Sequence, residues 1–516
     1  MKNSVSYIKE KIKGYFKKMF YISTRNNKIC KTPAEAVLEG ISKDGGLYMP
    51  KSFEGCIFPM EGLEKMSNKE ISAEVISLLF KGDKMLEDEN GELAGAYKLV
   101  SKAYDGKFEN EDYAPLASVD GAYVMELYHG PTCAFKDVAL QLLPQLVAAA
   151  KRSTGEKDEI VILTATSGDT GSAALSGFSG VDGIKIIVFY PRNGISAVQE
   201  RQMVSVDGKN TCVCSVGGNF DDAQSGVKNI FASLDLPKGV KLSSANSINI
   251  GRLAPQVAYY FKAYRDLLLN GEIKMGDKVN FVVPTGNFGD ILAGYFAKKM
   301  GLPVGKLVCA SNTNKVLTDF FENGVYNKNR SFYVTNSPSM DILISSNLER
   351  LLYLTCGDEK CANYMAQLKE NGQYKLEKEE LDKINSEFDA GFTNEEETIK
   401  TIRDVYEKCG YLMDTHTAVA WNVYEKWLAK TSNKDKTVVL STASPYKFSN
   451  SVMNALGKDY QGEFDALTKL NEYTGAKIPN SLINIEKKPI FHNVTVEKDE
   501  MLEFVDKMVN TKIWHE

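Results

Sequence analysis

The chain has 516 residues and lacks the features that mark several classes of protein. Its 15 prolines and 40 glycines follow no repeat, which excludes collagen-like and low-complexity chains. No apolar run approaches the roughly 18 residues of a membrane-spanning helix. The best candidate, 140–150, includes two glutamines and a proline. Four histidines are too few for a histidine-built centre, so we expect no bound metal.

A surplus of charge of one sign is also missing. The 62 basic and 67 acidic residues leave a formal charge of −5. This balance provides no general positive surface for nucleic acid or anionic membranes, so we expect neither as a partner. Nine cysteines, an odd number spread over the chain, fit reduced thiols better than a disulfide framework. The length predicts roughly two to four domains, and the whole indicates a cytoplasmic enzyme.

Residues 1–18 are an exception, with six lysines and one glutamate. Their apolar residues fall at helical spacing, which allows a short basic amphipathic helix in contact with a membrane. The segment lacks the apolar core of a secretory signal and the arginines of a transit peptide. We favour the simpler interpretation that translation starts at Met19 and the extension is incidental.

From residue 123 onward, strand-like apolar runs alternate with helix-like segments. Such alternation predicts an α/β fold with mainly parallel sheets. The predicted strands are 123–128, 160–164, 185–190, 211–216, 241–244, 279–283, 306–310 and 438–440. The flanking regions differ: residues 33–110 are helical and loop-rich, 325–410 is a charged helical insertion, and 456–516 returns to charged helix and loop.

The segment His129–Asp137 lies between a predicted strand and a predicted helix. Ligands of open α/β sheets bind where helices begin, because free N–H groups point outward there. Lys136 stands at that start, where a cation costs roughly 0.3–1 kcal/mol. The same field lowers the pKa of an amine, which suits covalent chemistry. A lysine near a loop is usually only solvated surface, and the surrounding motif favours function here.

Two further loops follow the same design. Thr164–Gly171 offers hydroxyls and amides to a carboxylate or phosphate, and Asp169 adds an acceptor for a hydroxyl group. Ser-Gly-Asp is also ordinary turn and helix-capping chemistry. In Pro284–Asp290, backbone amides of a glycine loop could hold a phosphate dianion without a lysine. It has neither the Walker nor the dinucleotide spacing, and a plain strand-to-helix turn is the alternative.

Taken together, these motifs resemble the threonine synthase family, whose members are pyridoxal-phosphate enzymes of fold type II. The match runs from near Tyr21 to about residue 460. Region 325–410 and the sequence Ser-Pro-Ser-Met-Asp at 337–341 resemble the longer microbial and fungal branch. The match is carried by residues 21–25, 44–48, 129–137, 167–171, 246–252, 286–290 and 440–448.

The resemblance implies a two-lobed α/β fold with mainly parallel sheets, an N-terminal α-rich domain and a helical insertion. It implies an enzyme that acts as a monomer or weak homodimer. The domains expected are a basic extension (1–18), an N-terminal domain (19–115), a larger cofactor-binding lobe (116–157 and 275–460, with the insertion 325–410), a smaller lobe (158–274) and a C-terminal helical and loop segment (461–516).

The resemblance also implies which residues bind pyridoxal 5'-phosphate. Lys136 forms the internal Schiff base, and Thr442 is the hydroxyl partner of the ring nitrogen. A hydroxyl cannot stabilise a pyridinium as a carboxylate would, so the ring is a weaker electron sink. Asp169 stands near the ring hydroxyl, where many relatives outside this branch have Asn, and Ser444 replaces a His of some members. The cofactor phosphate is expected on Gly286, Asn287, Phe288, Gly289 and Asp290.

The substrate implied is O-phospho-L-homoserine, which carries a carboxylate and a phosphate. Arg252 is the candidate for the phosphate, because guanidinium groups pair well with phosphate. Arg25 is a weaker candidate for anion capture, His129 is expected to orient the lysine loop, and Asp414 either joins the site or caps a helix. The other expected substrate contacts are Thr132, Ser167, Gly168, Thr170, Ser247 and Asn249.

The activity implied is conversion of O-phospho-L-homoserine and water to L-threonine and phosphate. The Lys136 amine would remove the α- and β-protons, phosphate would leave the γ-carbon, and water would add at the β-carbon. Two alternatives stay open. One is another fold type II lyase, such as a threonine dehydratase-like enzyme or a phospho-amino-acid lyase. The other is an inactive relative that only binds ligands, against which the intact Lys136, 286–290 loop and Thr442 argue.

Overall fold

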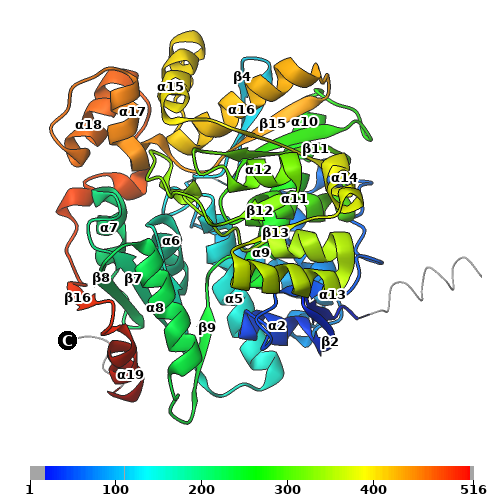
Figure 1. Cartoon of the computed structure of the whole chain (residues 1–516), viewed down its shortest axis with the longest axis vertical. Coiled ribbons are helices and arrows are strands. Elements are labelled where there is room, and N and C mark those ends of the chain that lie inside the picture. The colour runs from blue at the N-terminus through cyan, green and yellow to red at the C-terminus, as the bar shows by residue number, and fades with distance from the viewer. Residues whose placement is uncertain (1–17, 110, 512–516) are drawn as a thin grey trace, which may run out of the picture.

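The computed structural model describes residues 18–109 and 111–511. The segment 1–18, for which the sequence allows an amphipathic helix, therefore lies, apart from Lys18, outside the described residues. Two sheets organise the rest of the chain, and helices pack on both (Figure 1). The predicted α/β fold with mainly parallel sheets is confirmed. The domain boundaries given above stay a prediction.

The larger sheet has six strands in the order β14-β11-β10-β15-β5-β4. All neighbours are parallel except β4, which pairs antiparallel with β5. Both faces are covered: Phe281 and Val283 of β10 enter one core and Val282 enters another. The strands are β4 (Leu116–Val119), β5 (Ala122–Glu126), β10 (Val279–Pro284), β11 (Val304–Ser311), β14 (Phe388–Phe392) and β15 (Lys436–Ser441).

The smaller sheet has five strands, all parallel, in the order β16-β8-β7-β6-β9. Its strands are β6 (Glu159–Ala165), β7 (Ile184–Pro191), β8 (Thr211–Gly217), β9 (Val240–Ser244) and β16 (Val494–Glu497). Its helices are α6 (Asp169–Phe178), α7 (Ala197–Val204), α8 (Phe220–Ser233) and α19 (Met501–Thr511). The C-terminal segment thus supplies a strand as well as the predicted helices and loops, and residues 494–497 are too few for alternation to be recognised.

Helix α5 (Lys136–Thr154) packs against α6 of the smaller sheet and against α2 and α4 of the N-terminal region. That region holds α2 (Pro33–Glu39), α3 (Asn68–Leu79) and α4 (Glu92–Tyr104), with a small antiparallel sheet of β1 (Tyr21–Ser23), β2 (Asn26–Lys31) and β3 (Tyr48–Pro50). Thr32 and Glu35 form a reciprocal capping box at the start of α2. The small sheet was not predicted.

The predicted insertion is mainly helical but also contains strands. Strands β12 (Val325–Asn327) and β13 (Gln373–Lys375) pair antiparallel, and β14 extends the larger sheet beside β11. These strands are three to five residues long, so no period of two stands out in the sequence. The helices here are α13 (Leu348–Asn371), α14 (Lys378–Glu387) and α15 (Glu395–Cys409), and α12 (Val316–Asn323) comes just before the insertion.

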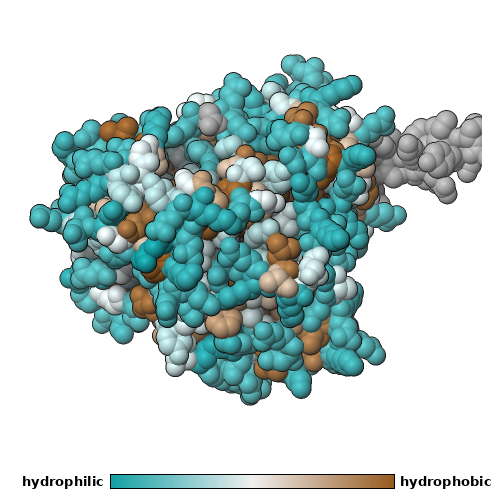
Figure 2. Space-filling model, turned by 90° about the horizontal axis from the view of Figure 1, so that it is seen from above, coloured by the Kyte–Doolittle hydropathy of each residue, from teal (hydrophilic) through white to brown (hydrophobic). Residues whose placement is uncertain are grey.

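The remaining helices are α9 (Ile250–Leu253), α10 (Val257–Leu269), α11 (Gly289–Lys299), α16 (Thr415–Thr431), α17 (Ser449–Ala455) and α18 (Glu463–Thr474). All nine cysteines are free thiols. The face in Figure 2 is mostly hydrophilic, with small separate hydrophobic patches. Within residues 18–109 and 111–511, no helix combines the length and apolarity needed to cross a membrane.

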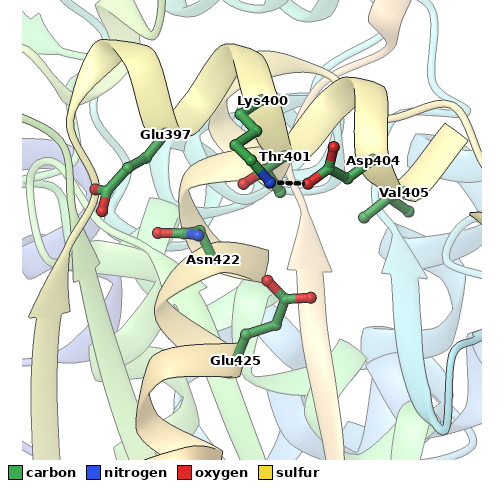
Figure 3. A pocket seen from close by; sticks show the side chains of 7 residues that line it. All are labelled: Glu397, Lys400, Thr401, Asp404, Val405, Asn422 and Glu425. Atoms are coloured by element: carbon green, nitrogen blue, oxygen red, sulfur yellow. Dashed lines mark hydrogen bonds and ion pairs between the residues drawn. The ribbon is translucent and has the colours of Figure 1, made fainter. Parts of the chain in front are cut away.

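A hollow on the protein surface lies between α15 and α16 (Figure 3). Its lining is mainly charged and polar, and Lys400 and Asp404 form an ion pair along its rim. It contains none of the residues predicted for cofactor or substrate, so the candidate site must be sought elsewhere. The lining residues are Glu397, Lys400, Thr401, Asp404, Val405, Asn422 and Glu425.

Candidate active site

The loop before α5 is fixed by the segment that follows β15. The Phe135 N–H donates to the Thr442 carbonyl (2.8 Å), and the Ser444 N–H donates to the Cys133 carbonyl (3.0 Å). Ala134 and Ala443 form an antiparallel bridge between them. These contacts place Lys136, the first residue of α5, next to Thr442, although 306 positions separate the two in sequence (442 − 136).

The Lys136 side chain is 11% exposed, and its Nζ lies 3.5 Å from Asp169 Oδ2. Burial lowers the pKa of Lys136, and the positive charges of Arg252 and Lys447 lower it further. The carboxylates of Asp169 and Asp290 oppose that shift. A neutral amine is therefore more accessible here than on a solvated lysine, mainly because of burial. The expected depression of its pKa is thus found, with burial as its largest cause.

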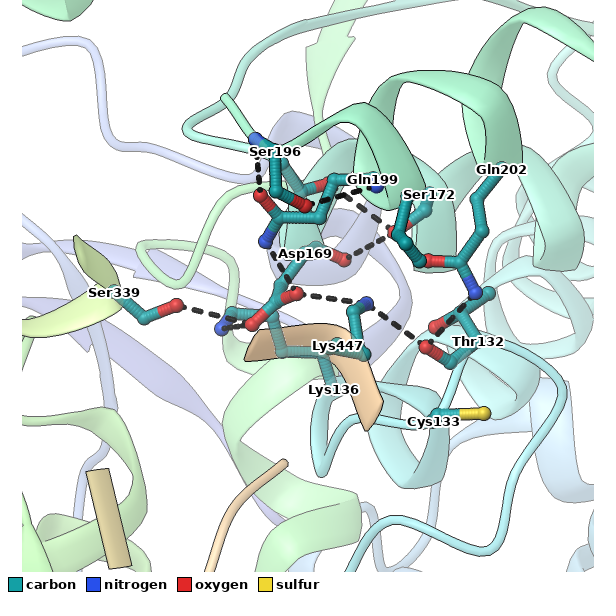
Figure 4. Close-up of polar contacts among 12 residues, drawn as sticks. Thr132, Cys133, Lys136, Asp169, Ser172, Ser196, Gln199, Gln202, Ser339 and Lys447 are labelled. Atoms are coloured by element: carbon teal, nitrogen blue, oxygen red, sulfur yellow. Dashed lines mark hydrogen bonds and ion pairs between the residues drawn. The ribbon is translucent and has the colours of Figure 1, made fainter. Parts of the chain in front are cut away.

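Asp169 begins α6 and connects several elements (Figure 4). Its Oδ1 accepts a hydrogen bond from Gln199 Nε2 (2.9 Å) and pairs with Lys447 Nζ (2.7 Å). Its Oδ2 accepts from Ser339 Oγ (3.0 Å) and faces Lys136. Burial works against ionisation, but Lys447, Lys136 and Gln199 together hold the pKa of Asp169 well below its usual range. The carboxylate is therefore ionised and fully paired.

The glycine loop joins β10 to α11, as predicted. The backbone N–H groups of Asn287, Phe288 and Gly289 have no hydrogen-bond acceptor among the described residues. Phe288 adopts a left-handed conformation (φ 63°) immediately before the helix. At Gly286 a Cβ atom would lie 2.6 Å from the Ser339 carbonyl oxygen, so only glycine fits. Unpaired amides at the start of an eleven-residue helix make an anion site that needs no lysine.

Arg252 lies in α9 and is 5% exposed. Its Nη1 donates to the Ala245 carbonyl (2.8 Å), and no carboxylate pairs with it within the described part of the chain. Burial lowers the pKa of Arg252 to about 10. A buried guanidinium without a counter-ion is costly unless an anion joins it. Ser247 is close to the glycine loop, because its Cβ would be 3.7 Å from a Cβ at Gly289.

Several other predicted residues already have local partners. Asn249 caps α9 through Gly251 N–H and donates to the carbonyls of Val37 and Ser244. Thr132 donates through its N–H and hydroxyl to Asp137, whose pKa burial raises to about 6. Asn249 and Thr132 thus stabilise the backbone beside Arg252 and Lys136.

The structure shows which groups Arg25 and Asp414 contact. Arg25 forms a two-point ion pair with Glu349, with both distances 2.8 Å. Asp414 caps α16 by accepting from the N–H groups of His416 and Thr417. It also contacts His416 Nδ1 (2.6 Å), whose Nε2 accepts from the Ser339 N–H (3.1 Å). The cap of α16 therefore supports the Ser339 segment through His416.

Three segments of the chain match family models. Residues 20–97 match the threonine synthase N terminus, residues 112–443 match the pyridoxal-phosphate dependent enzyme family, and residues 417–505 match the threonine synthase C-terminal family. Threonine synthase from Saccharomyces cerevisiae is 37% identical over 466 residues, which is 84% of this chain and 88% of the yeast protein. The chain belongs to the threonine synthase family. It is therefore a pyridoxal-phosphate-dependent enzyme, as the motifs predicted.

Two further relatives agree with this membership of the threonine synthase family. Threonine synthase from Pseudomonas aeruginosa is 38% identical over 441 residues, which covers 85% of this chain and 90% of that protein. The crystal structure of pyridoxal-phosphate-bound threonine synthase from Brucella melitensis has a TM-score of 0.83 and 36% identity, and covers 96% of this chain and 99% of that chain. The two-lobed fold type II architecture is thereby confirmed.

The residues present fit the cofactor of the threonine synthase family. The unpaired amides of the 286–290 loop suit its phosphate, and the Lys136 amine suits its aldehyde. Thr442 is 5% exposed. Its carbonyl oxygen accepts from the Phe135 N–H, which places this hydroxyl-bearing residue next to Lys136.

Sequence reasoning missed three residues of this site: Gln199, Ser339 and Lys447. Each reaches Asp169 from a separate part of the chain. Ser339 and Lys447 lie in the segments 337–341 and 440–448 that carried the resemblance, but neither was assigned a role. For Gln199 the only signal was the pair Ser196 and Gln199 at capping-box spacing, which indicates a helix start and no function.

Proposed function

We propose that the chain converts O-phospho-L-homoserine and water to L-threonine and phosphate, with Lys136 as the residue that holds the cofactor and moves protons. The observation that carries this proposal is the position of Lys136. Its amine is nearly buried at the start of α5, has a lowered pKa, and shares its surroundings with Asp169, Arg252 and Asp290. Family membership supports the reaction type.

We assign the cofactor contacts as follows. Lys136 Nζ would bond covalently to the cofactor aldehyde, and the amides of Asn287, Phe288 and Gly289 would bind its phosphate. Thr442 Oγ1 would be the partner of the ring nitrogen, and Asp169 would be near the ring hydroxyl. When bound, pyridoxal phosphate withdraws electrons from the substrate's α-carbon and so eases loss of its proton. Burial raises the pKa of the Asp290 carboxyl to about 6, and a phosphate dianion beside it would favour the neutral, protonated form further.

Lys136 is the proton-transfer group in this proposal. A group that takes and returns protons works best when its pKa lies near the working pH. Burial and the cations of Arg252 and Lys447 move the pKa of Lys136 in that direction. The amine is held at the start of α5, so it reaches the same position for each successive transfer.

The two anionic groups of the substrate have separate candidates. Arg252, with Ser247, would bind the phosphate and stabilise it as it leaves, because the buried guanidinium has no other charged partner among the described residues. The start of α6, at Ser167, Gly168 and Thr170, would bind the carboxylate, although the Gly168 N–H itself already donates to Thr166 Oγ1. The remaining candidates, Asn249 and Thr132, would act by positioning.

We propose a cytoplasmic location, a monomer or weak homodimer, and no nucleic-acid or membrane partner. The formal charge of −5 supports the last point, since polyanions are bound by surplus positive charge. The nine free cysteines suit a reducing compartment.

Product analysis tests the proposed function. The purified full chain with pyridoxal phosphate is incubated with O-phospho-L-homoserine, and amino acids and inorganic phosphate are quantified together. We expect threonine and phosphate in equal amounts, and neither from the Lys136→Ala variant. Formation of 2-oxobutyrate in place of threonine would instead support a dehydratase-like lyase, and no turnover at all would support a ligand-binding relative.

A further inference from the structure

A second buried lysine meets the same carboxylate as Lys136. Lys447 Nζ lies 2.7 Å from Asp169 Oδ1, whereas Lys136 Nζ lies 3.5 Å from Oδ2. The Lys447 side chain is 0% exposed. Figure 4 shows both amines beside the Asp169 carboxylate. Lys447 is thus closer to Asp169 and more deeply buried than Lys136, yet the proposed reaction assigns it no role.

The surrounding chain holds Lys447 in one position. It lies in the 3₁₀ helix Pro445–Phe448, whose start is capped by Ser444 Oγ accepting from the Tyr446 N–H. Besides Asp169, its Nζ donates to the Thr132 carbonyl oxygen at 2.8 Å. Lysines are rarely buried without partners that compensate the loss of hydration. The burial and hydrogen bonds of Lys447 therefore make it an integral part of the site.

The Asp169 carboxylate alone would oppose the chemistry of Lys136. A negative charge within about 4–6 Å favours the protonated amine. A protonated amine can neither bond to a carbonyl carbon nor accept a proton. Gln199 and Ser339 also bind Asp169, but both are neutral and cannot balance its charge.

We propose that Lys447 is a positioning residue that serves as the counter-charge of Asp169, so that the Lys136 amine is not held in a tight ion pair. The Nζ of Lys447 lies 2.7 Å from Asp169 and the Nζ of Lys136 lies 3.5 Å from it, so Lys447 forms the tighter ion pair. Lys447 also fixes Asp169 in place for its contact with the cofactor. This inference rests on the proposed role of Lys136.

The charged groups around the two lysines determine how removal of Lys447 changes the pKa of Lys136. Without Lys447, Lys136 loses a nearby cation and keeps the Asp169 carboxylate, which Gln199, Ser339 and Lys136 itself still hold ionised. Both changes raise the pKa of the nitrogen on Lys136. The groups facing Lys136 are Asp169 of α6, Arg252 of α9, Asp290 of α11 and Lys447, and Asp137 of α5 also faces Lys447.

The test is a pH titration of the visible absorption band of the cofactor-bound full chain, without substrate, for wild type and Lys447→Met. We expect the midpoint to rise by at least about 1 pH unit in the variant. Lys447→Arg keeps the charge and should stay near wild type. In Asp169→Asn/Lys447→Met both opposing charges are gone, and the midpoint should return toward the wild-type value.

Lys262→Met is the matched control, because Lys262 is also 0% exposed and ion-paired but lies in a separate cluster with Asp112 and Asp266. It should leave the midpoint unchanged. An unmoved midpoint in a folded, cofactor-binding Lys447→Met protein would overturn the inference, as would equal shifts in Lys447→Arg or Lys262→Met. If Lys447→Met does not fold, Lys447→Gln removes the same charge but keeps a donor for the Thr132 carbonyl, and the same rise in the midpoint is expected. Because no substrate is used, this result is independent of whether threonine is formed.

Discussion

Two clusters of buried lysine in this chain handle charge in opposite ways. In the first, Lys262 of α10 pairs with Asp266 (2.5 Å) and Asp112 (2.6 Å), and Arg265 pairs with Asp266 (2.5 Å). Two cations thus face two carboxylates. In the second, the cations are Lys136, Lys447 and Arg252: Asp169 pairs with the two lysines, and Arg252 has no carboxylate partner among the described residues.

The difference shows which cluster is structural and which awaits a ligand. The Lys262 cluster is balanced and needs nothing further. At the Lys136 cluster burial lowers the pKa values of Lys136 and Arg252 and raises that of Asp290 to about 6, so burial disfavours charge on all three, and Arg252 has no carboxylate partner among the described residues. Burying these groups makes the folded state less stable, and bound phosphate groups would compensate for that loss. Perturbed pKa values of this kind gather at functional sites.

The largest effect is expected for Lys136→Ala. Loss of both the covalent link and the proton-transfer group should lower kcat by about 10⁴-fold or more, which is about 5 kcal/mol. Steady-state kinetics on variant protein reconstituted with cofactor would measure it. Lys262→Ala serves as the comparison. A variant lacking Lys136 that keeps a tenth of wild-type kcat would show that the cluster was misassigned.

Arg252→Gln should come next. If Arg252 binds the substrate phosphate, kcat/KM should fall by about 10²- to 10³-fold, since a buried charged hydrogen bond to the leaving group is lost. The cofactor's visible band should stay. Arg265→Gln is the matched control and should leave kcat/KM of the folded protein unchanged, because its partners Asp266, Asn68 and Met66 lie in the balanced cluster.

Lys262→Met should act on stability alone. Removing one partner of a buried ion pair leaves uncompensated carboxylates, and we expect the free energy of unfolding to fall by about 2–4 kcal/mol. Arg265 still pairs with Asp266, which limits the loss. Urea unfolding gives the free energy, and kcat of the remaining folded protein should match wild type. A large loss of kcat in a Lys262→Met protein as stable as wild type would show that the Lys262 cluster is not purely structural.

The smallest effect is expected for Asp290→Asn. The pKa of Asp290 is about 6 in the folded chain and about 4 when unfolded. Between these values the folded chain retains a proton that the unfolded chain has lost, so this group makes stability fall as pH rises from about 4 to about 6. Asparagine does not titrate. Relative to wild type, the variant should gain about 2 kcal/mol between pH 4 and pH 7 in urea unfolding. Parallel pH profiles for the two proteins would contradict this.

The central sheet and its loops were predictable because their signals are local. β10 is a fully buried, mostly apolar strand that leads directly into the glycine loop, and the mostly buried strand β6 leads into the loop of Asp169. β14 and β16 were missed because five and four residues at sheet edges show no clear period. Lys447 and Ser339 were missed for a different reason. Ser339 meets Asp169 across 170 residues of sequence, so only the folded chain brings them together.

Reductive labelling tests the central claim, that Lys136 and neither of the other two buried lysines holds the cofactor. The cofactor-loaded full chain is treated with borohydride, digested and mapped by mass spectrometry. We predict one pyridoxyl-modified peptide, with the modification on Lys136 and none on Lys447 or Lys262. A modification on either of those lysines, or an unmodified Lys136 in a protein that binds the cofactor, would contradict the account.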